Sequence, residues 1–211
     1  MADLEEQVKK GVRILRRGGV VAFPTDTVYG LGADAFNAAA VERIYQIKKR
    51  PRHLPLPVLI GDMKQLALLA EPLTELALFL AQRFWPGGLT LVLPQVSGLP
   101  AYLGGAGVAV RLPAHPVCRA LIRGVGSPIT GTSANLSGKP SALTAGEVRE
   151  QLGNGVDLVI DGGRCPGGVE STVVDLTGEK PAVLRQGIIP QEEIDRAVAE
   201  YCGGEELCEL P

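Results

Sequence analysis

The sequence predicts an α/β protein in which helices flank a twisted mixed sheet. Apolar strands and amphipathic helices are interleaved along the 211 residues, which is typical of layered α/β domains. The segments LTLVLP and VAVRLP follow one another without a helix, and STVVDL and PAVLR predict a hairpin across the turn TGEK. These features argue against a purely parallel sheet, and a mixed parallel/antiparallel sheet can leave one concave face open for a ligand.

The first half of the chain predicts four helices and three strands. The opening helix is capped by Asp3, carries one apolar face and ends at Gly18-Gly19. The segment AAAVERIYQIKK predicts a second helix that begins after Asn37 and ends before Pro51. Further helices are expected at DMKQLALLA and TELALFLAQRF, and strands at VVAF, PLPVLI and LTLVLP.

The second half continues the α/β pattern. The strand VAVRLP is followed by a helix, HPVCRALIRG, and by the short strand SPIT, which opens onto the polar loop GTSANLSGKPSA. Thr144 and Glu147 form a capping box for TAGEVREQL. The strand VDLVID, the hairpin and a final helix, PQEEIDRAVAEY, complete the pattern. No repeat or linker interrupts it, so we expect one domain over residues 1–211.

Composition narrows the functional classes. Twenty-one Lys and Arg stand against 23 Asp and Glu, and aromatic residues make up 4% of the chain. Both features argue against a dedicated nucleic-acid-binding protein. No apolar run reaches the roughly 18 residues of a membrane span, and MADLEEQVKK does not resemble a signal peptide. The four cysteines form no CxxC pair and there are two His, which argues against a zinc site and favours free thiols in a cytoplasmic protein.

Four segments share one design, in which a regular element runs into small polar or basic residues. They are PTDTVYG, IKKRPRHLP, TGTSANLSGKP and GVESTVVD. Two arginines add to them: Arg111 lies inside an apolar strand, and Arg185 lies at the end of the last strand. Strand alternation places Arg111 on the same face as Ala109. Its side chain either faces solvent or is presented to a carboxylate or phosphate, which its two-pronged geometry suits.

The basic cluster and the polar loop each have two interpretations. Lys48, Lys49, Arg50 and Arg52 can form a solvated helix end that complements the helix dipole. Because Pro51 forces a sharp turn beside a strand, they can also form a cation cluster for a polyphosphate. The loop GTSANLSGKP lacks the GxxxxGK[ST] spacing of a phosphate loop. Its hydroxyl and amide groups either form turns or recognise a small polar ligand.

The sequence contains no motif for acyl transfer or hydrolysis. GxSxG and HExxH are absent, and two His leave little room for a Ser-His-Asp system. We therefore expect a substrate that supplies its own nucleophile, in a site that works by positioning and charge neutralisation.

The blocks PTDTVYGLG, KKRP, SAN followed by SGKP, ESTVVD and LRQG together resemble the YrdC-type threonylcarbamoyl-AMP synthases. They cover nearly all of residues 8–188, and Lys48-x-Arg50 combined with Ser133-x-Asn135 is the most specific feature. The resemblance implies a YrdC-like fold with a concave basic cavity, in a short, single-domain form. It also implies that the enzyme makes threonylcarbamoyl-AMP and pyrophosphate from L-threonine, bicarbonate and ATP. A partner complex would then transfer the threonylcarbamoyl group to an adenosine of tRNA.

The resemblance also assigns roles to individual residues. Threonine binding is expected from Thr27, Arg111, Ser133 and Ser171, with Tyr29 and the glycines beside it shaping the pocket. Nucleotide binding is expected from Lys48, Arg50, Asn135 and Arg185. Mg²⁺ is expected to be held mainly by phosphates, because the carboxylates nearest the motifs are as easily turn or capping residues; these are Asp26, Asp161 and Glu170. No catalytic residue and no metal ligand is assigned.

Two positions depart from the family pattern. Leu54 stands where many members have Lys or Asn, and Leu59 stands where some members have a His near the threonine. Neither leucine side chain can form a hydrogen bond. These departures leave open a paralogue that keeps the fold but uses another acceptor.

Two rival functions remain at this point. Related domains in hydrogenase maturation adenylate a carbamoyl group that comes from carbamoyl phosphate, usually in long chains with zinc-binding cysteines. An RNA-binding module without turnover would instead use a basic concave face to follow a phosphate backbone. The near-zero net charge and the few aromatic residues argue against strong RNA binding.

Overall fold

The computed structural model describes residues 2–203. The helices are α1 (Ala2–Arg16), α2 (Ala38–Lys48), α3 (Glu75–Phe84), α4 (Pro116–Val125), α5 (Ala145–Leu152) and α6 (Gln191–Tyr201), with 3-10 turns η1 (Met63–Leu68) and η2 (Gly153–Gly155). The strands are β1 (Val21–Phe23), β2 (Gly30–Gly32), β3 (Val58–Leu59), β4 (Leu89–Leu93), β5 (Val108–Arg111), β6 (Ile129–Thr130), β7 (Thr132–Ser133), β8 (Leu158–Val159), β9 (Thr172–Asp175) and β10 (Ala182–Arg185).

The predicted fold class is confirmed, with the strands divided between two hydrogen-bonded sheets. The four-stranded sheet has the order β7-β2-β1-β8, and the six-stranded sheet has the order β10-β9-β4-β5-β3-β6. Both are mixed: β1 pairs parallel with β8 and antiparallel with β2, and β4 pairs parallel with β9 and antiparallel with β5. An isolated bridge between Asp34 and Ile129 connects the two sheets.

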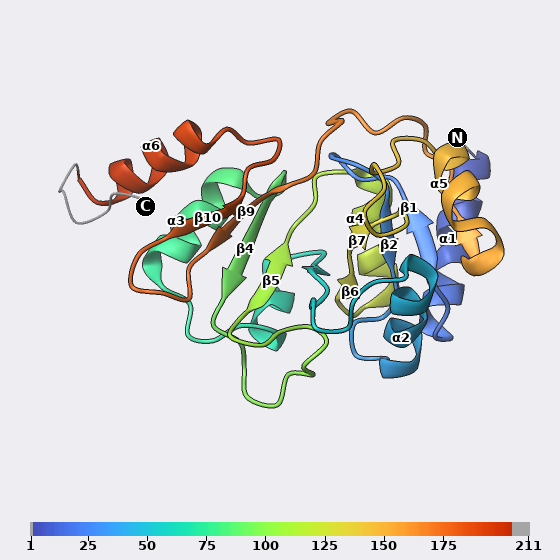
Figure 1. Cartoon of the computed structure of the whole chain (residues 1–211), viewed down its shortest axis with the longest axis horizontal. Helices are drawn as coiled ribbons and strands as arrows, with labels where there is room; N and C mark the ends of the chain where they lie inside the picture. Colours follow the sequence, from blue (N-terminus) through green and yellow to red (C-terminus); the bar gives the residue numbers. More distant parts are fainter. Residues whose placement is uncertain (1, 204–211) are drawn as a thin grey trace.

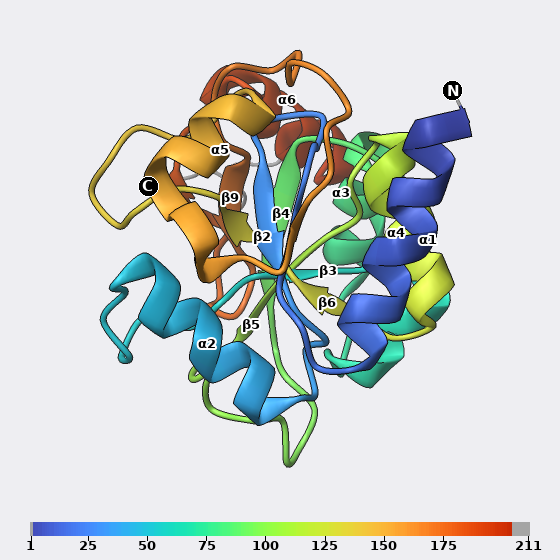
Figure 2. The ribbon, with the colours of Figure 1, turned by 90° about the vertical axis from the view of Figure 1, so that its right-hand side faces the viewer.

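Three apolar clusters fix the helices onto the sheets (Figure 1). One cluster packs α3 and α6 against the six-stranded sheet, and a second packs α2 and α5 against the four-stranded sheet. The third lies under α1 and α4, which run side by side (Figure 2). Within residues 2–203, no helix is long and apolar enough to cross a membrane.

The predicted helix ends are confirmed where a side chain caps the first turn. Asn37 Oδ1 accepts a hydrogen bond from Ala40 N over 3.1 Å, and Thr144 Oγ1 accepts one from Glu147 N over 3.2 Å. At the other end of α2, Lys49 adopts a left-handed conformation with φ 51°. This turn ends the helix and sends the following residues toward the β3 strand.

The predicted hairpin is confirmed, because β9 and β10 pair antiparallel. Several local predictions are wrong. Asp3 lies within the first turn of α1 and does not cap it, and the strand β7 falls in the predicted polar loop. The segment DMKQLALLA forms the 3-10 turn η1, in which the Asp62 carboxylate accepts from the backbone N–H of Lys64 and Gln65. The strand β2 was not predicted, because its sequence GLG has low strand propensity. Glycine is required there by close approach: a Cβ at Gly32 would lie 2.5 Å from the carbonyl oxygen of Thr130.

Candidate active site

A cavity of about 430 Å³ is lined by residues from both sheets. The lining residues come from the loop after β1, the end of α2, strands β3 and β5, the β7 loop and the β9–β10 hairpin. It brings together all eight residues that the sequence assigned to substrate binding: Thr27, Lys48, Arg50, Arg111, Ser133, Asn135, Ser171 and Arg185. Segments more than 150 residues apart in the sequence therefore meet at one site. The division of these residues between threonine and nucleotide stays a prediction.

Arg111, the last residue of β5, is only 6% exposed. Its Nε donates to the carbonyl oxygen of Gly87 over 2.8 Å, and Nη1 donates to Thr27 Oγ1 over 2.9 Å. Its Nη2 lies 2.8 Å from Asp26 Oδ2, an ion pair whose angle falls outside hydrogen-bond geometry. The solvent-facing interpretation of Arg111 is therefore wrong.

Asp26 was not predicted to belong to the site. Its Oδ2 pairs with Arg111, and its Oδ1 accepts from Ala114 N over 2.9 Å, so it joins the loop after β1 to the turn before α4. The signal that could have found it is physical: an arginine inside an apolar strand needs an anionic partner. Asp26 lies between two threonines in the polar loop after β1.

The hydroxyl of Thr27 has a defined donor and acceptor state. Thr25 Oγ1 donates to the carbonyl oxygen of Val28 over 2.6 Å, so the hydrogen bond of 3.0 Å between the two hydroxyls uses the proton of Thr27. Thr27 Oγ1 also accepts from Arg111. One lone pair remains. Thr27 can therefore accept a hydrogen bond from a ligand N–H or O–H but has no proton left to donate.

Lys48 is buried and its ammonium group is surrounded by oxygen atoms of the β7 loop. It donates to the carbonyl oxygen of Ser133, to the carbonyl oxygen of Asn135 over 2.6 Å and to Asn135 Oδ1 over 3.2 Å. Burial lowers the pKa of Lys48 to about 8, with the charge of Arg50 acting in the same direction and that of Glu170 opposing it. The solvated-helix-end interpretation is therefore wrong for Lys48.

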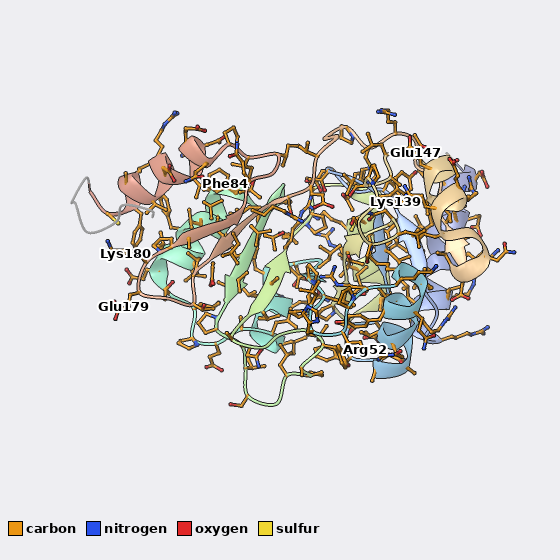
Figure 3. The ribbon with its side chains drawn as sticks, in the orientation of Figure 1. Arg52, Phe84, Lys139, Glu147, Glu179 and Lys180 are labelled. Atoms are coloured by element: carbon orange, nitrogen blue, oxygen red, sulfur yellow. The ribbon has the colours of Figure 1, made fainter. Side chains whose placement is uncertain are left out.

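The two arginines of the basic cluster lie in different places, one at the cavity and one on the surface. Arg50 lines the cavity and donates to the carbonyl oxygens of Leu54 and Pro55 over 3.2 and 3.1 Å. Burial lowers the pKa of Arg50. Arg52 instead pairs with Glu42 on the surface of α2 (Figure 3). Only two of the four predicted cations, Lys48 and Arg50, line the cavity.

Arg185 forms the opposite wall of the cavity together with Glu170 and Ser171. Arg185 donates to the Glu170 carboxylate, to the carbonyl oxygen of Ser171 over 2.9 Å and to Ser171 Oγ over 3.2 Å. Ser171 Oγ also shares a hydrogen bond of 2.8 Å with Thr90 Oγ1. Burial acts to raise the pKa of Glu170, but the hydrogen bond from Ser141 and the charge of Arg185 outweigh it and lower the pKa.

A second cavity of about 720 Å³ adjoins the first, and the two share Val28, Glu170 and Arg185 as lining residues. The ion pair of Glu170 and Arg185 therefore lies on the boundary between the cavities. Sequence reasoning treated Glu170 as a turn or capping residue, and the structure places it inside the site.

The two leucines that depart from the family pattern both line the cavity. Leu54 is 40% exposed, whereas Leu59 is buried against Gly131, where a Cβ would lie 2.2 Å from Leu59 Cγ. Leu59 therefore fills space between β3 and the start of the β7 loop. It contributes an apolar wall where some family members have a His.

Tyr29 does not line either cavity, so the expectation that it shapes the pocket is wrong. Its side chain is buried beneath the loop, and its hydroxyl donates to the carbonyl oxygen of Gly163 over 2.9 Å. Burial raises the pKa of Tyr29 to about 12, with the hydrogen bond from Gly162 N opposing the rise. Gly30 packs against Phe23 and not against the cavity.

The cysteines are not all free. Cys118 and Cys165 are free and buried, and burial raises the pKa of both thiols. Cys202 is disulfide-bonded, so the expectation of a free thiol is wrong there; Cys208 lies outside the described residues. Among residues 2–203, no group of three His, Cys, Asp or Glu side chains is placed to hold a metal ion.

Comparison with known proteins shows the family of this chain and matches its fold. The chain is 46% identical to the threonylcarbamoyl-AMP synthases of Pyrococcus abyssi and Bacillus subtilis, over 93% and 92% of its own length. It spans 58% and 57% of those two proteins, a little over half of their length. The crystal structure of P. abyssi Sua5 complexed with L-threonine superposes with a TM-score of 0.89 and 43% identity, covering 97% of this chain and 58% of that one. The Sua5_yciO_yrdC family model, described as "Telomere recombination", matches residues 13–187. The chain therefore belongs to the Sua5/YciO/YrdC family.

Proposed function

We propose that this chain makes threonylcarbamoyl-AMP and pyrophosphate from L-threonine, bicarbonate and ATP, and so acts as a nucleotidyltransferase. The observation that carries the proposal is the pairing of two half-sites in one cavity. The cavity holds one buried arginine, Arg111, and two less buried arginines, Arg50 and Arg185. We assign the first to the amino acid and the other two to the nucleotide. The names of the two 46%-identical relatives and the threonine complex of a structural neighbour support the same activity.

The amino-acid half is built around Arg111. In the proposal, Arg111 shares its positive charge between Asp26 and the carboxylate of threonine. Thr27 has only an accepting lone pair left, so it accepts from the ammonium, amine or hydroxyl group of threonine and not from its carboxylate. Ser133 and Ser171 complete this half with their hydroxyl groups.

The nucleotide half contains Lys48, Arg50, Asn135 and Arg185, and within it the two arginines are assigned to contact the phosphates directly. Guanidinium groups bind phosphate oxygens with two parallel hydrogen bonds, which suits Arg50 and Arg185. Arg185 also pairs with Glu170. A phosphate bound there would compete with this carboxylate for the same donor.

The chemistry needs no dedicated general base. The neutral amine of threonine adds to the carbon of carbon dioxide and loses a proton to water, giving an anionic carbamate; when bicarbonate itself reacts, a water molecule leaves instead. A carbamate oxygen then bonds to the α-phosphorus of ATP while the bond to the bridging oxygen breaks and pyrophosphate leaves. Arg50 and Arg185 offset the charge that builds up on the phosphates, so catalysis rests on positioning and charge neutralisation.

Mg²⁺ fits this site as a companion of the phosphates. Among the described residues that line the main cavity, Glu170 is the only carboxylate, and it is already paired with Arg185. We propose that Mg²⁺ is held mainly by ATP phosphates and water, where it supplies further charge neutralisation to the leaving pyrophosphate. If a protein side chain also binds Mg²⁺, we propose Glu170, because it is the carboxylate that lines this cavity.

The proposal extends to the cellular setting. We place the protein in the cytoplasm, with residues 1–211 acting as one YrdC-like catalytic domain. A downstream tRNA-modifying complex takes the threonylcarbamoyl group from the product. Direct contact with RNA is expected to be weak, because Lys and Arg do not outnumber Asp and Glu.

Pyrophosphate release tests the proposal. We expect release from ATP only when threonine and bicarbonate are both present, and none when either is omitted. Turnover with carbamoyl phosphate in their place would instead favour the activity of the hydrogenase-maturation relatives. Salt-dependent RNA binding without any ATP turnover would favour an RNA-binding module.

A further inference from the structure

We infer that Lys48 and Asn135 do not bind phosphate themselves but hold the loop 133–139 in place, and that Lys139 is the cation of this loop that reaches the nucleotide. This inference rests on the proposed function for its nucleotide part only. The hydrogen bonds of the ligand-free protein carry the first part.

The hydrogen bonds of the Lys48 ammonium group are fully used within the protein. An ammonium group has three donors and no acceptor. The three donors are directed at the carbonyl oxygen of Ser133 and at the carbonyl and Oδ1 oxygens of Asn135. A phosphate contact would therefore require Lys48 to leave a buried carbonyl oxygen unsatisfied, which is costly in a dry site.

The amide group of Asn135 is committed in the same way. Both of its Nδ2 protons are donated within the loop, to the carbonyl oxygens of Leu136 and Lys139. Its Oδ1 accepts from Lys48. The side chain is only 5% exposed. Asn135 therefore has no free donor for a phosphate oxygen.

Lys48 and Asn135 together form what we call the Lys48–Asn135 brace. Its bonds fix both ends of the loop, because they reach from Ser133 to Lys139. The backbone of Lys48 contributes as well, since its carbonyl oxygen accepts from Ser137 N over 3.0 Å. The brace thus ties the loop to the C-terminal end of α2, next to Arg50.

The loop presents a different cation to the cavity. Ser137, Gly138 and Lys139 are exposed and line the cavity. No described carboxylate lies within salt-bridge distance of the Lys139 side chain, in contrast to Arg185, which is paired with Glu170. Figure 3 shows Lys139 on the β7 side of the molecule, away from Arg52, which lies in the turn after α2. An unpaired, exposed lysine at the cavity is suited to bind the outer phosphates.

Hydrogen exchange of the ligand-free protein tests the brace without any reference to nucleotide. We compare Lys48→Met and Asn135→Ala with wild type and monitor the backbone amides of residues 134–139. These amides are all hydrogen-bonded except that of Gly138, so the brace predicts at least about tenfold faster exchange in both variants. Unchanged exchange in both variants would overturn the brace. If Lys48→Met does not fold, the Asn135→Ala protein decides by the same criterion.

Nucleotide affinity provides the second measurement. Because either substitution opens the same loop, the double variant should bind ATP no more weakly than the weaker single variant; the fold-losses should not multiply. Multiplied losses with wild-type exchange rates would show two independent phosphate contacts. Lys139→Met is the matched control, because it removes a cation from the same loop but leaves the brace intact. We expect normal exchange in this control and a fold-loss for ATP several times larger than for AMP.

Equal losses of ATP and AMP affinity in Lys139→Met would overturn the assignment of Lys139. A protein that binds neither ATP nor AMP, but shows the expected exchange pattern, would refute the proposed function while leaving the brace standing. The two conclusions therefore fail in distinguishable ways.

Discussion

The two halves of the cavity solve the same problem, the binding of an anion, in opposite ways. On the amino-acid side, Arg111 is buried on a strand and already paired with Asp26 and Thr27. On the nucleotide side, Arg185 is 46% exposed at the end of an edge strand, and Arg50 follows a helix end. The first cation is fixed and dehydrated before any ligand arrives, and the second pair is accessible to solvent.

This difference indicates where specificity and where adaptability are located. A buried and fully oriented guanidinium group loses little freedom on binding, so it can discriminate between small ligands by geometry. Exposed arginines lose more freedom but can follow a flexible polyphosphate through reaction and release. We therefore expect the loss of Arg111 to have a larger effect than the loss of either arginine on the nucleotide side.

The largest effect is expected for Arg111→Ala. Removing one partner of a buried charge pair costs about 2–5 kcal/mol, which corresponds to a roughly 30-fold to several-thousand-fold loss of threonine affinity. ATP binding to the protein without threonine should stay nearly intact. Calorimetry with each ligand alone measures both quantities. Loss of ATP binding with normal threonine binding would show that the two halves are assigned the wrong way round.

A matched double variant separates binding from folding. Arg111→Ala leaves the Asp26 carboxylate without its cation, and breaking a buried pair destabilises proteins by about 3–5 kcal/mol. Asp26→Asn in the same chain removes the uncompensated charge. We expect the double variant to recover most of the free energy of unfolding but none of the threonine affinity. Recovery of both would mean that Arg111 acts on threonine only through the fold.

The next effect is a change in the free energy of unfolding with pH, and it arises because Lys48 is buried whereas Arg50 and Arg185 are more exposed. Burial lowers the pKa of Lys48 from 10.5 to about 8. Between these two values the unfolded chain holds a proton that the folded chain lacks, so the stability contributed by Lys48 rises with pH across this window. The rise is up to about 3 kcal/mol. Urea unfolding of wild type and Lys48→Met from pH 7.5 to 10.5 isolates it as the difference between the two proteins.

A fall in the stability of wild type relative to Lys48→Met with rising pH would contradict this prediction. If wild type loses stability relative to Lys48→Met as the pH rises, the three hydrogen bonds of the ammonium group outweigh its burial. Other groups that titrate in this range, such as the tyrosines of the unfolded chain, are present in both proteins and cancel in the comparison.

A smaller effect is expected for Arg50→Ala, because Arg50 is only half-buried and its present partners are backbone carbonyl oxygens. Hydrogen bonds to charged groups contribute about 1.5–3 kcal/mol, so ATP affinity should fall roughly 10- to 150-fold. Threonine affinity, measured alone, should not change. A matched control is Arg52→Ala, since Arg52 belongs to the same basic cluster but pairs with Glu42. An equal loss of ATP affinity in both variants would show that ATP responds to the overall positive charge of this region and not to a direct contact with Arg50.

The same contrast explains what could be predicted from the sequence. Helix ends, the hairpin and the mixed pairing follow from local signals such as Asn37, Thr144 and the turn TGEK. All eight predicted site residues line one cavity because family motifs mark the positions that must converge. The charge partners were not predictable in this way. Asp26 and Glu170 pair with Arg111 and Arg185 across 85 and 15 positions of sequence, and no local pattern encodes such contacts.

The smallest effect is expected for the choice between threonine and serine, and it tests whether the amino-acid half is a shaped pocket. The cavity wall carries short or apolar groups: Leu59 lies beside Arg111 on the neighbouring strand β3, and Ala109 and Val173 also line the cavity. One methyl group in an apolar pocket is worth about 1–3 kcal/mol, so kcat/KM for serine should be roughly 5- to 150-fold lower than for threonine. Because Leu59 is 3% exposed and packs on Gly131, Leu59→Ala should enlarge the pocket and reduce this preference without changing ATP affinity measured alone. Steady-state pyrophosphate release with each amino acid measures the ratio in both proteins. Equal use of serine and threonine by wild type would show that the rigid side of the cavity reads only the ammonium and carboxylate groups, with the guanidinium of Arg111 rather than an apolar wall setting its selectivity.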